Sequence, residues 1–192
     1  MRNRGRRPAI LLATASVAAV PLTACGGGSN SGTISATSYI GTLCTSTASW
    51  LRGIEARTGA LEGELAPNVS PAEKKRVLES LVSTAVSDTE SVVTSLRTAG
   101  VPQVNNGKHI SDLVVSSFEG ISGRLAGLQS QIASLPTNDP AAFDEQAKKI
   151  REQVREAPLR LGIGVAGVNS PELEKAASES AVCKSVGARA KT

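Results

Sequence analysis

Residues 70–102 read SPAEKKRVLESLVSTAVSDTESVVTSLRTAGVP and carry the clearest helix signal in the chain. Ser70 is a favoured N-cap residue, Pro71 suits the first helical position, and Glu73 places an acid in the first turn. Gly100 and Pro102 supply a stop signal. Between these ends, apolar residues recur at steps of three and four, at Val77, Leu78, Leu81, Val82, Ala85, Val92, Val93 and Leu96. The pattern predicts one long amphipathic helix.

Apolar residues with helical spacing also occur on both sides of this segment. A first helix is expected over residues 38–65, with its stripe at Ile40, Leu43, Thr47, Trp50, Ile54, Leu61 and Leu65. A third is expected over residues 110–135, with its stripe at Ile110, Val114, Phe118, Ile121, Leu125, Leu128, Ile132 and Leu135. A fourth begins at Asp139-Pro140 and has its stripe at Phe143, Ala147, Ile150 and Val154. Its outer positions are charged: Lys148, Lys149, Arg151, Glu152, Arg155 and Glu156.

The C-terminal part of the chain has weaker signals. Pro158 should kink or stop the fourth helix. Residues 159–169 are apolar and glycine-rich, and they form either a kinked continuation of that helix or a covering loop. Ser170-Pro171 starts a last short helix that should run to about Cys183, and residues 184–192 are expected to be loose.

The composition favours helices packed on helices. Hydrophobic residues make up 40% of the chain but aromatic residues only 2%, whereas the strands of β-sandwiches favour aromatics. Three long helices and a shorter fourth, joined by short turns, predict an all-α fold. We expect an up-down-up-down four-helix bundle with a short C-terminal helix, spanning residues 37–192.

The N-terminus has the features of an export signal. Four arginines among the first seven residues precede an apolar run from Ala9 to Leu22. The sequence Leu22-Thr23-Ala24-Cys25 resembles the lipobox of bacterial lipoproteins of the high-GC Gram-positive type. This resemblance implies that residues 1–24 are a signal peptide and that Cys25 carries a thioether-linked lipid. Residues 25–36 are then expected to form a flexible, disordered tether, because Gly, Ser, Asn and Thr dominate the segment.

Removal of residues 1–24 changes the charge balance. The whole chain has 21 basic and 17 acidic residues, but four of the basic ones lie in residues 1–24, where no acid occurs. The remaining residues carry 17 bases and 17 acids, which argues against nucleic acid as a partner. No stretch after Cys25 is apolar enough to span a membrane. The lipid is therefore expected to hold the protein at the extracytoplasmic face of the cell membrane.

Assigning Cys25 to the lipid leaves Cys44 and Cys183. An exported protein meets an oxidising environment, so these two residues are expected to form a disulfide; two buried free thiols are the alternative. In an up-down-up-down bundle, the first helix begins at the end where the fourth finishes. That topology would bring Cys44 close to Cys183.

The sequence predicts no catalytic residues, no cofactor and no metal site. Residues 162–167 fit Gly-x-Gly-x-x-Gly, but no strand precedes them, so a flexible linker is favoured over a dinucleotide site. His109, Asp112 and Ser116 lie close to one helix face, yet a straight helix offers no oxyanion hole beside the serine. A solvated polar face with a Lys108–Asp112 pair is favoured. One histidine and widely spaced cysteines argue against a metal site.

Two further features have both structural and functional interpretations. Ser116, Gly120, Gly123 and Gly127 form a stripe of small residues. The stripe is either a groove for a ligand or acyl chain or a surface that lets a neighbouring helix approach; close packing is favoured, because a bare groove exposes backbone. Trp50, the single tryptophan, lies on the apolar stripe of the first helix and is expected in the core.

The segment Tyr39-Ile40-Gly41-Thr42-Leu43-Cys44, with Trp50 six residues on, is similar to small secreted helical proteins of high-GC Gram-positive bacteria. In these proteins an early and a late cysteine bracket the domain, so the resemblance implies a topology and no activity. We expect a non-enzymatic interaction or scaffold module, anchored in the cell envelope, whose partner is an envelope protein. The alternative is a lipoprotein that binds an apolar small molecule or lipid between its helices or under residues 159–168. An enzyme would need ionisable residues from separate helices to converge in a pocket.

Overall fold

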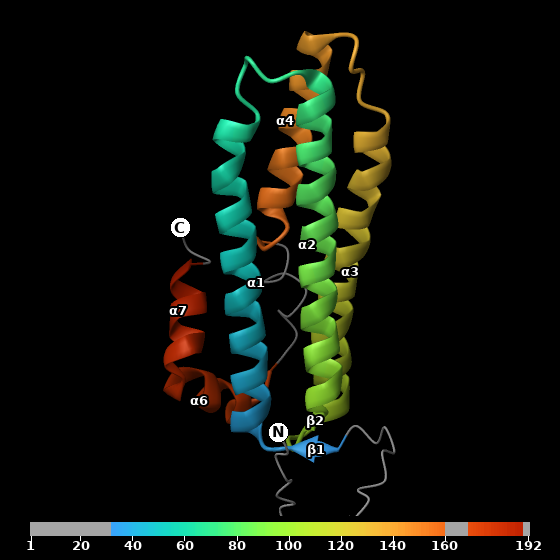
Figure 1. Cartoon of the computed structure of the whole chain (residues 1–192). Coiled ribbons are helices and arrows are strands. Elements are labelled where there is room, and N and C mark those ends of the chain that lie inside the picture. The colour runs from blue at the N-terminus through green and yellow to red at the C-terminus, as the bar shows by residue number, and fades with distance from the viewer. Residues whose placement is uncertain (1–31, 160–168, 190–192) are drawn as a thin grey trace, which may run out of the picture. The chain divides into compact units, whose positions relative to one another are not determined.

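The computed structural model describes residues 32–159 and 169–189, all within one unit of the chain, residues 31–192 (Figure 1). The helices in these ranges are α1 (Ala36–Glu64), α2 (Pro71–Ala99), α3 (Gly107–Ala133), α4 (Pro140–Glu156), α6 (Pro171–Glu179) and α7 (Ala181–Arg189). Two short strands, β1 (Thr33–Ile34) and β2 (Val101–Pro102), form a parallel pair. Apart from this pair the described ranges are all-α, as predicted. None of their helices has both the length and the apolar character needed to cross a membrane.

The core is centred on α2, which packs against α1, α3 and α4. The apolar stripes predicted for α2, α3 and α4 are almost completely buried, which confirms the helical register of each. Trp50 of α1 is only 2% exposed, and its ring meets that of Phe118 edge-on, with 5.5 Å between ring centroids. The indole N–H donates to Thr89 Oγ1 at 2.9 Å. The predicted core position of Trp50 is confirmed, and its buried polar nitrogen has a partner.

Capping side chains mark the starts of the three helices that begin with proline. Ser70 Oγ accepts a hydrogen bond from the amide of Glu73 at the start of α2, and Ser170 Oγ accepts from the amide of Leu173 in α6. Asp139 caps α4 in the same way. Each of these helices begins with proline, whose missing N–H costs nothing at that position. The predicted starts of α2, α4 and the helix after residue 170 are confirmed.

The flexible tether expected over residues 25–36 is wrong at its C-terminal end. Residues 25–31 lie outside the described ranges, but β1 follows them directly. Ser35 then caps α1, which starts at Ala36. A composition rich in Gly, Ser and Thr predicts flexibility, yet here the segment after residue 31 finds a backbone partner elsewhere in the chain.

That partner is β2, which lies between α2 and α3, where the sequence predicts a helix stop and a short turn. The amide of Val101 donates to Gly32 O at 3.2 Å, and the amide of Gln103 donates to Ile34 O at 2.8 Å. Gly100 precedes the strand with a φ of 94°, and a Cβ on this residue would lie 2.0 Å from Gly32 O. Only glycine combines this backbone conformation with so close an approach.

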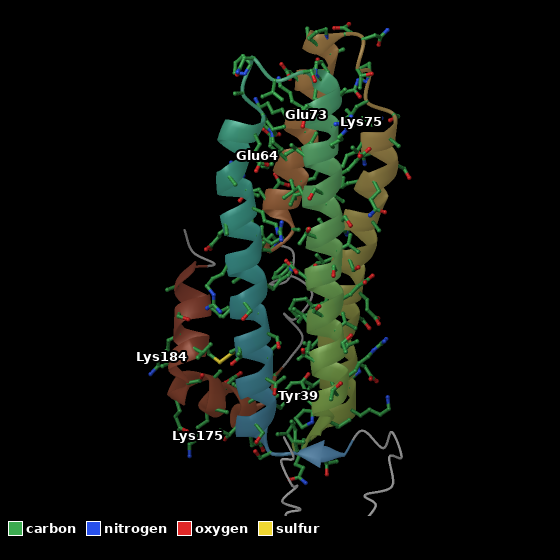
Figure 2. All side chains as sticks on the ribbon, in the orientation of Figure 1. Tyr39, Glu64, Glu73, Lys75, Lys175 and Lys184 are labelled. Carbon is green, nitrogen blue, oxygen red and sulfur yellow. A yellow bond between two sulfur atoms is a disulfide. The ribbon has the colours of Figure 1, made fainter. Side chains whose placement is uncertain are left out.

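The predicted disulfide is present: Cys44 of α1 and Cys183 of α7 are bonded, with 5.1 Å between their Cα atoms (yellow in Figure 2). The single short helix expected from residue 170 to about Cys183 is wrong, because Ser180 adopts extended backbone and separates α6 from α7. α7 then continues to Arg189, where loose chain was expected. Both α6 and α7 pack against α1.

Candidate functional site: a basic cleft between α1 and α4

The polar residues singled out on α3 lie on its solvent-exposed side. His109, Asp112 and Ser116 are all exposed, and Asp112 Oδ2 pairs with Lys108 Nζ at 2.7 Å. Their interpretation as a solvated polar face is confirmed. Within residues 32–159 and 169–189, no group of three or more His, Cys, Asp or Glu residues is placed to hold a metal ion.

Several predicted features lie outside the described residues. These are the signal peptide with Cys25, the Gly-x-Gly-x-x-Gly segment at 162–167, and most of the glycine-rich region 159–169. The lipid on Cys25 and the linker interpretation of residues 162–167 stay predictions.

The stripe of small residues on α3 does not pack against another helix, so this prediction is wrong. Ser116, Gly120, Gly123 and Gly127 are all exposed, and a Cβ added to any of these glycines would have no atom of another element within 4 Å. The reason is the register of the helix. The stripe lies two positions after the buried residues of α3, which turns it about 200° away from the core.

A depression lies on the surface between the C-terminal half of α1 and α4. It consists of two adjoining hollows of about 300 and 250 Å³. The first is lined by Leu65, Pro67, Lys74, Asp144, Ala147, Lys148 and Arg151. The second is lined by Thr58, Leu61, Lys148, Arg151, Glu152 and Arg155. Lys148 and Arg151 line both hollows, which together we name the basic cleft.

The register of α4 explains why charged side chains line this cleft. Its buried residues are Phe143, Ala147, Ile150 and Val154. Asp144, Lys148, Arg151 and Arg155 each follow one of them by one position. One step along a helix turns the side chain by about 100°, so these four lie beside the buried stripe rather than opposite it. Leu61 of α1, which is 4% exposed, contributes an apolar wall.

The cleft carries an excess of positive charge. Its two acids each have a basic partner: Asp144 Oδ1 lies 2.9 Å from Lys74 Nζ, and Glu152 Oε1 lies 4.0 Å from Lys148 Nζ. Lys74 itself is buried, with 5% of its surface exposed. Arg151 makes no ion pair with a described residue, and its buried Nε has no hydrogen-bond partner among them. With Arg155, four basic and two acidic side chains line the cleft.

The burial of Lys74 and the half-buried position of Arg151 were not predicted from the sequence. Lys74 lies four residues before Leu78, on the buried stripe of α2, and a lysine at such a position is a recognisable signal. Arg151 was assigned to the charged outer side of α4. Its position next to Ile150 could have placed it at the edge of the core, but the packing of α1 beside that edge is a tertiary feature.

A separate hollow, of about 260 Å³, lies between α3 and α4. It is lined by Ile121, Arg124, Leu125, Leu128, Gln131, Gln153 and Ala157. The aliphatic residues at its base are buried, whereas Arg124, Gln131 and Gln153 are exposed at its rim. The hollow therefore opens to solvent, and its volume is below the roughly 300–1,000 Å³ of typical small-molecule sites.

The basic cleft offers charged hydrogen-bond donors beside an apolar wall, an arrangement that favours an anion. Its hydroxyl group, on Thr58, donates within α1 to the carbonyl oxygens of Ile54 and Glu55, at 2.8 and 3.1 Å. Comparisons of the chain with protein-family models, curated proteins and solved structures found no match. The function is therefore inferred from these contacts and from the N-terminal sequence.

Proposed function

We propose that this protein is a lipid-anchored, non-enzymatic binding module of the cell envelope, attached through Cys25 at the extracytoplasmic face of the cell membrane. The lipobox-like sequence supports the anchor. Six residues lie between Cys25 and Gly32, so the seven steps from one to the other can span at most about 25 Å. A lipid on Cys25 would therefore keep the β1 end of the helical domain near the membrane.

The observation that carries the binding role is the position of the basic cleft along α1. The cleft uses Thr58, Leu61 and Leu65 at the C-terminal end of this helix, whereas β1 precedes its N-terminal end. A helix of 29 residues is about 43 Å long. The charged surface would thus be presented far from the anchored end, where an envelope partner could reach it.

We also infer that α1–α4 form an up-down-up-down four-helix bundle. Two observations support this topology. Lys75, near the start of α2, donates to Ala133 O at the end of α3, at 2.7 Å. Leu61 and Glu64, near the end of α1, line one hollow together with Val77 near the start of α2. Both arrangements are those of antiparallel neighbours.

The alternative function, binding of an apolar small molecule or lipid, is supported by the hollow between α3 and α4. Its base is aliphatic, as such a ligand requires. Its small volume and open rim provide less burial than an apolar ligand needs. The protein-binding proposal is therefore preferred.

Replacement of the lipidated residue tests the anchor. Cys25→Ala is expected to move the protein from the membrane fraction to the soluble fraction, whereas Ser29→Ala, in the same segment, should leave it at the membrane. Mass spectrometry should find a modified Cys25 at the mature N-terminus. An unmodified cysteine, or retention of residues 1–24, would overturn the anchor.

Site-specific photocrosslinking in intact envelopes tests the binding role. A photoreactive residue in place of Thr58 should give a discrete adduct with one envelope protein, because the basic cleft faces the partner. The same residue in place of Gly123, on the exposed stripe of α3, is the control and should give none. Equal adducts from both positions, or none from Thr58, would contradict the proposal.

A further inference from the structure

We propose that the basic cleft binds a phosphate group and that Arg151 is its principal ligand. The inference concerns the ligand chemistry of the proposed binding module and rests on that function only for the origin of the ligand. It starts from the Nε–H of Arg151, which is buried and donates to no described residue. A buried donor without an acceptor costs about 1–3 kcal/mol, so this position favours a ligand that supplies an oxygen atom.

The chemistry of the guanidinium group specifies what kind of oxygen is favoured. Arg151 stays charged at any physiological pH, and Nε–H and a terminal N–H of the same group point in parallel. This fork matches two oxygens of one carboxylate or phosphate. Arg151 has no carboxylate partner among the described residues, because Asp144 pairs with Lys74 and Glu152 with Lys148.

The charge of the basic cleft favours phosphate over carboxylate. Four basic and two acidic residues line it, which leaves an excess of two positive charges. A phosphate monoester carries about −1.5 to −2 at pH 7 and would neutralise this excess, whereas a carboxylate would neutralise half of it. Lys148 and Arg155, which lie one turn on either side of Arg151 along α4, are placed to contribute.

The surroundings of Arg151 strengthen its interaction with an anion. Leu61 and Ala147 are 4% exposed, and both line the cleft. Apolar walls lower the local dielectric, so a charge at the cleft interacts more strongly than one on an open helix face. Hollows of about 250 and 300 Å³ leave room for a phosphate and part of the group that carries it.

Lys149 provides a matched control for Lys148. The two lysines are adjacent on α4 and both are exposed, but Lys149 does not line the cleft. Its Nζ lies 2.7 Å from Glu145 Oε1, and this hydrogen bond lowers the pKa of the Glu145 carboxyl. Lys148→Gln and Lys149→Gln remove the same charge from the same helix. A difference in phosphate affinity between the two variants therefore measures the contribution of the cleft.

The test is an NMR titration of the ¹⁵N-labelled full chain in detergent with inorganic phosphate, following the arginine Nε–Hε signals. The signal that Arg151→Lys removes should shift saturably, and chloride at equal ionic strength should leave it unchanged. Arg151→Gln should weaken phosphate binding by about tenfold to a hundredfold, the loss of a charged hydrogen bond. Lys148→Gln should weaken it severalfold, and Lys149→Gln less than twofold.

Three results would overturn the proposal. These are an unshifted Arg151 signal in phosphate, an equal shift in chloride, and equal losses in Lys148→Gln and Lys149→Gln. Arg151→Lys keeps the charge but loses the fork, so it must also bind more weakly; this variant decides the matter if Arg151→Gln fails to fold. The Cys25 experiments do not depend on phosphate, so failure here leaves the proposed anchor standing.

The source of the phosphate is distinguished by two further ligands. Glycerol phosphate in solution is compared with phosphatidylcholine vesicles that contain phosphatidic acid, whose headgroup is also a phosphate monoester, each competing against inorganic phosphate at Arg151. Competition by glycerol phosphate supports a soluble phosphate monoester, and competition by the phosphatidic acid vesicles alone supports a lipid headgroup. Failure of both to compete would limit the site to an adventitious ion and overturn its role in binding.

Discussion

At the β1 end of the helical domain, the Cys44–Cys183 disulfide and the β1–β2 pair join segments that lie far apart in the sequence. At the other end of α1 and α2, the corresponding links are the Lys74–Asp144 ion pair and the hydrogen bond from Lys75 to Ala133. Figure 2 shows the two ends, with Tyr39 near one and Glu64 and Glu73 near the other. One end is held by covalent and backbone links, and the other by side-chain polar contacts.

We relate this difference to two roles, which are structural stability at the β1 end and ligand binding at the other end. A disulfide and a strand pair restrict the chain whatever the surface charge, so the structure of the β1 end does not depend on charged contacts. Side-chain contacts at the other end leave Arg151 unpaired among described residues and Lys74 beside an exposed acid. Lys74 has its carboxylate, so Arg151 is the cation at this end whose buried Nε–H has no acceptor among the described residues.

Removal of the disulfide should have the largest effect on stability. Cys44→Ser with Cys183→Ser, in a Cys25→Ala background, opens a link between residues 139 positions apart. The chain-entropy model values such a link at up to about 5 kcal/mol. Urea unfolding followed by the fluorescence of Trp50 should show the loss, and amide exchange should rise in α6 and α7. An unchanged unfolding midpoint would mean that the β1 end does not depend on its covalent link.

The strand pair at the same end should be the next most sensitive element. Gly100→Ala places a Cβ against Gly32 O and forces a non-glycine residue to a φ of 94°. We expect a loss of about 2–3 kcal/mol and faster amide exchange at Val101 and Gln103, which donate to the β1 segment.

Gly59→Ala is the matched control for this substitution. Gly59 is exposed within α1, and a Cβ there would have no atom of another element within 4 Å. Alanine should therefore stabilise the helix by up to about 1 kcal/mol. Thermal unfolding should give opposite signs for the two glycine variants. A loss of similar size in both would show that the strand pair contributes little.

The sequence predicts those parts of the fold that depend on local periodicity and local signals. The cap at Ser70 and the stripe that follows it specify α2 without reference to any other segment. The disulfide also followed, because assigning Cys25 to the lipid left two cysteines for a bundle to bring together. These features can be predicted from the spacing of apolar residues and the number of cysteines, and both can be obtained from a single sequence.

The features that the sequence did not predict depend on distant partners. β1 is two residues long and exists because β2 lies beside it, so composition alone assigned it to a tether. The exposed glycine stripe of α3 resembled a packing surface because its spacing is helical, but spacing does not say which face meets α2. The environment of Arg151 was not predicted for the same reason, because it depends on α1, which lies far from α4 in the sequence.

At the end opposite β1, removing one partner of the Lys74–Asp144 pair should lower the free energy of unfolding more than removing both partners. Asp144→Ala leaves the Lys74 ammonium buried without its carboxylate, which we expect to cost about 1–3 kcal/mol. Lys74→Met with Asp144→Ala replaces the pair by an apolar side chain and should recover most of this loss. Urea unfolding of both single variants and the double variant gives the coupling. Additive losses would show no coupling between the two side chains and would contradict the expected cost of a buried ammonium that has lost its carboxylate.

The smallest effect is expected at Tyr39, which lies fully buried at the β1 end. Its hydroxyl has no hydrogen-bond partner there. Burial raises the pKa of Tyr39; nearby Ser111 opposes the shift without forming a hydrogen bond of good geometry, and the charge of Asp112 adds to it. Removing an unsatisfied hydroxyl by Tyr39→Phe should change stability at pH 7 by no more than about 1 kcal/mol, towards greater stability.

The same substitution should have a distinct effect in alkali. A raised folded pKa means that the contribution of Tyr39 is fully present below its unfolded value, near 10, and is lost as pH rises through the folded value. Urea unfolding from pH 9 upwards should therefore show a steeper loss in the parent protein than in Tyr39→Phe. Tyr39 is the single tyrosine, so tyrosinate absorbance reports its titration directly. Ionisation of the folded protein at the ordinary pKa, or parallel stability profiles, would show that solvent reaches the hydroxyl and that the β1 end is less tightly closed than its links imply.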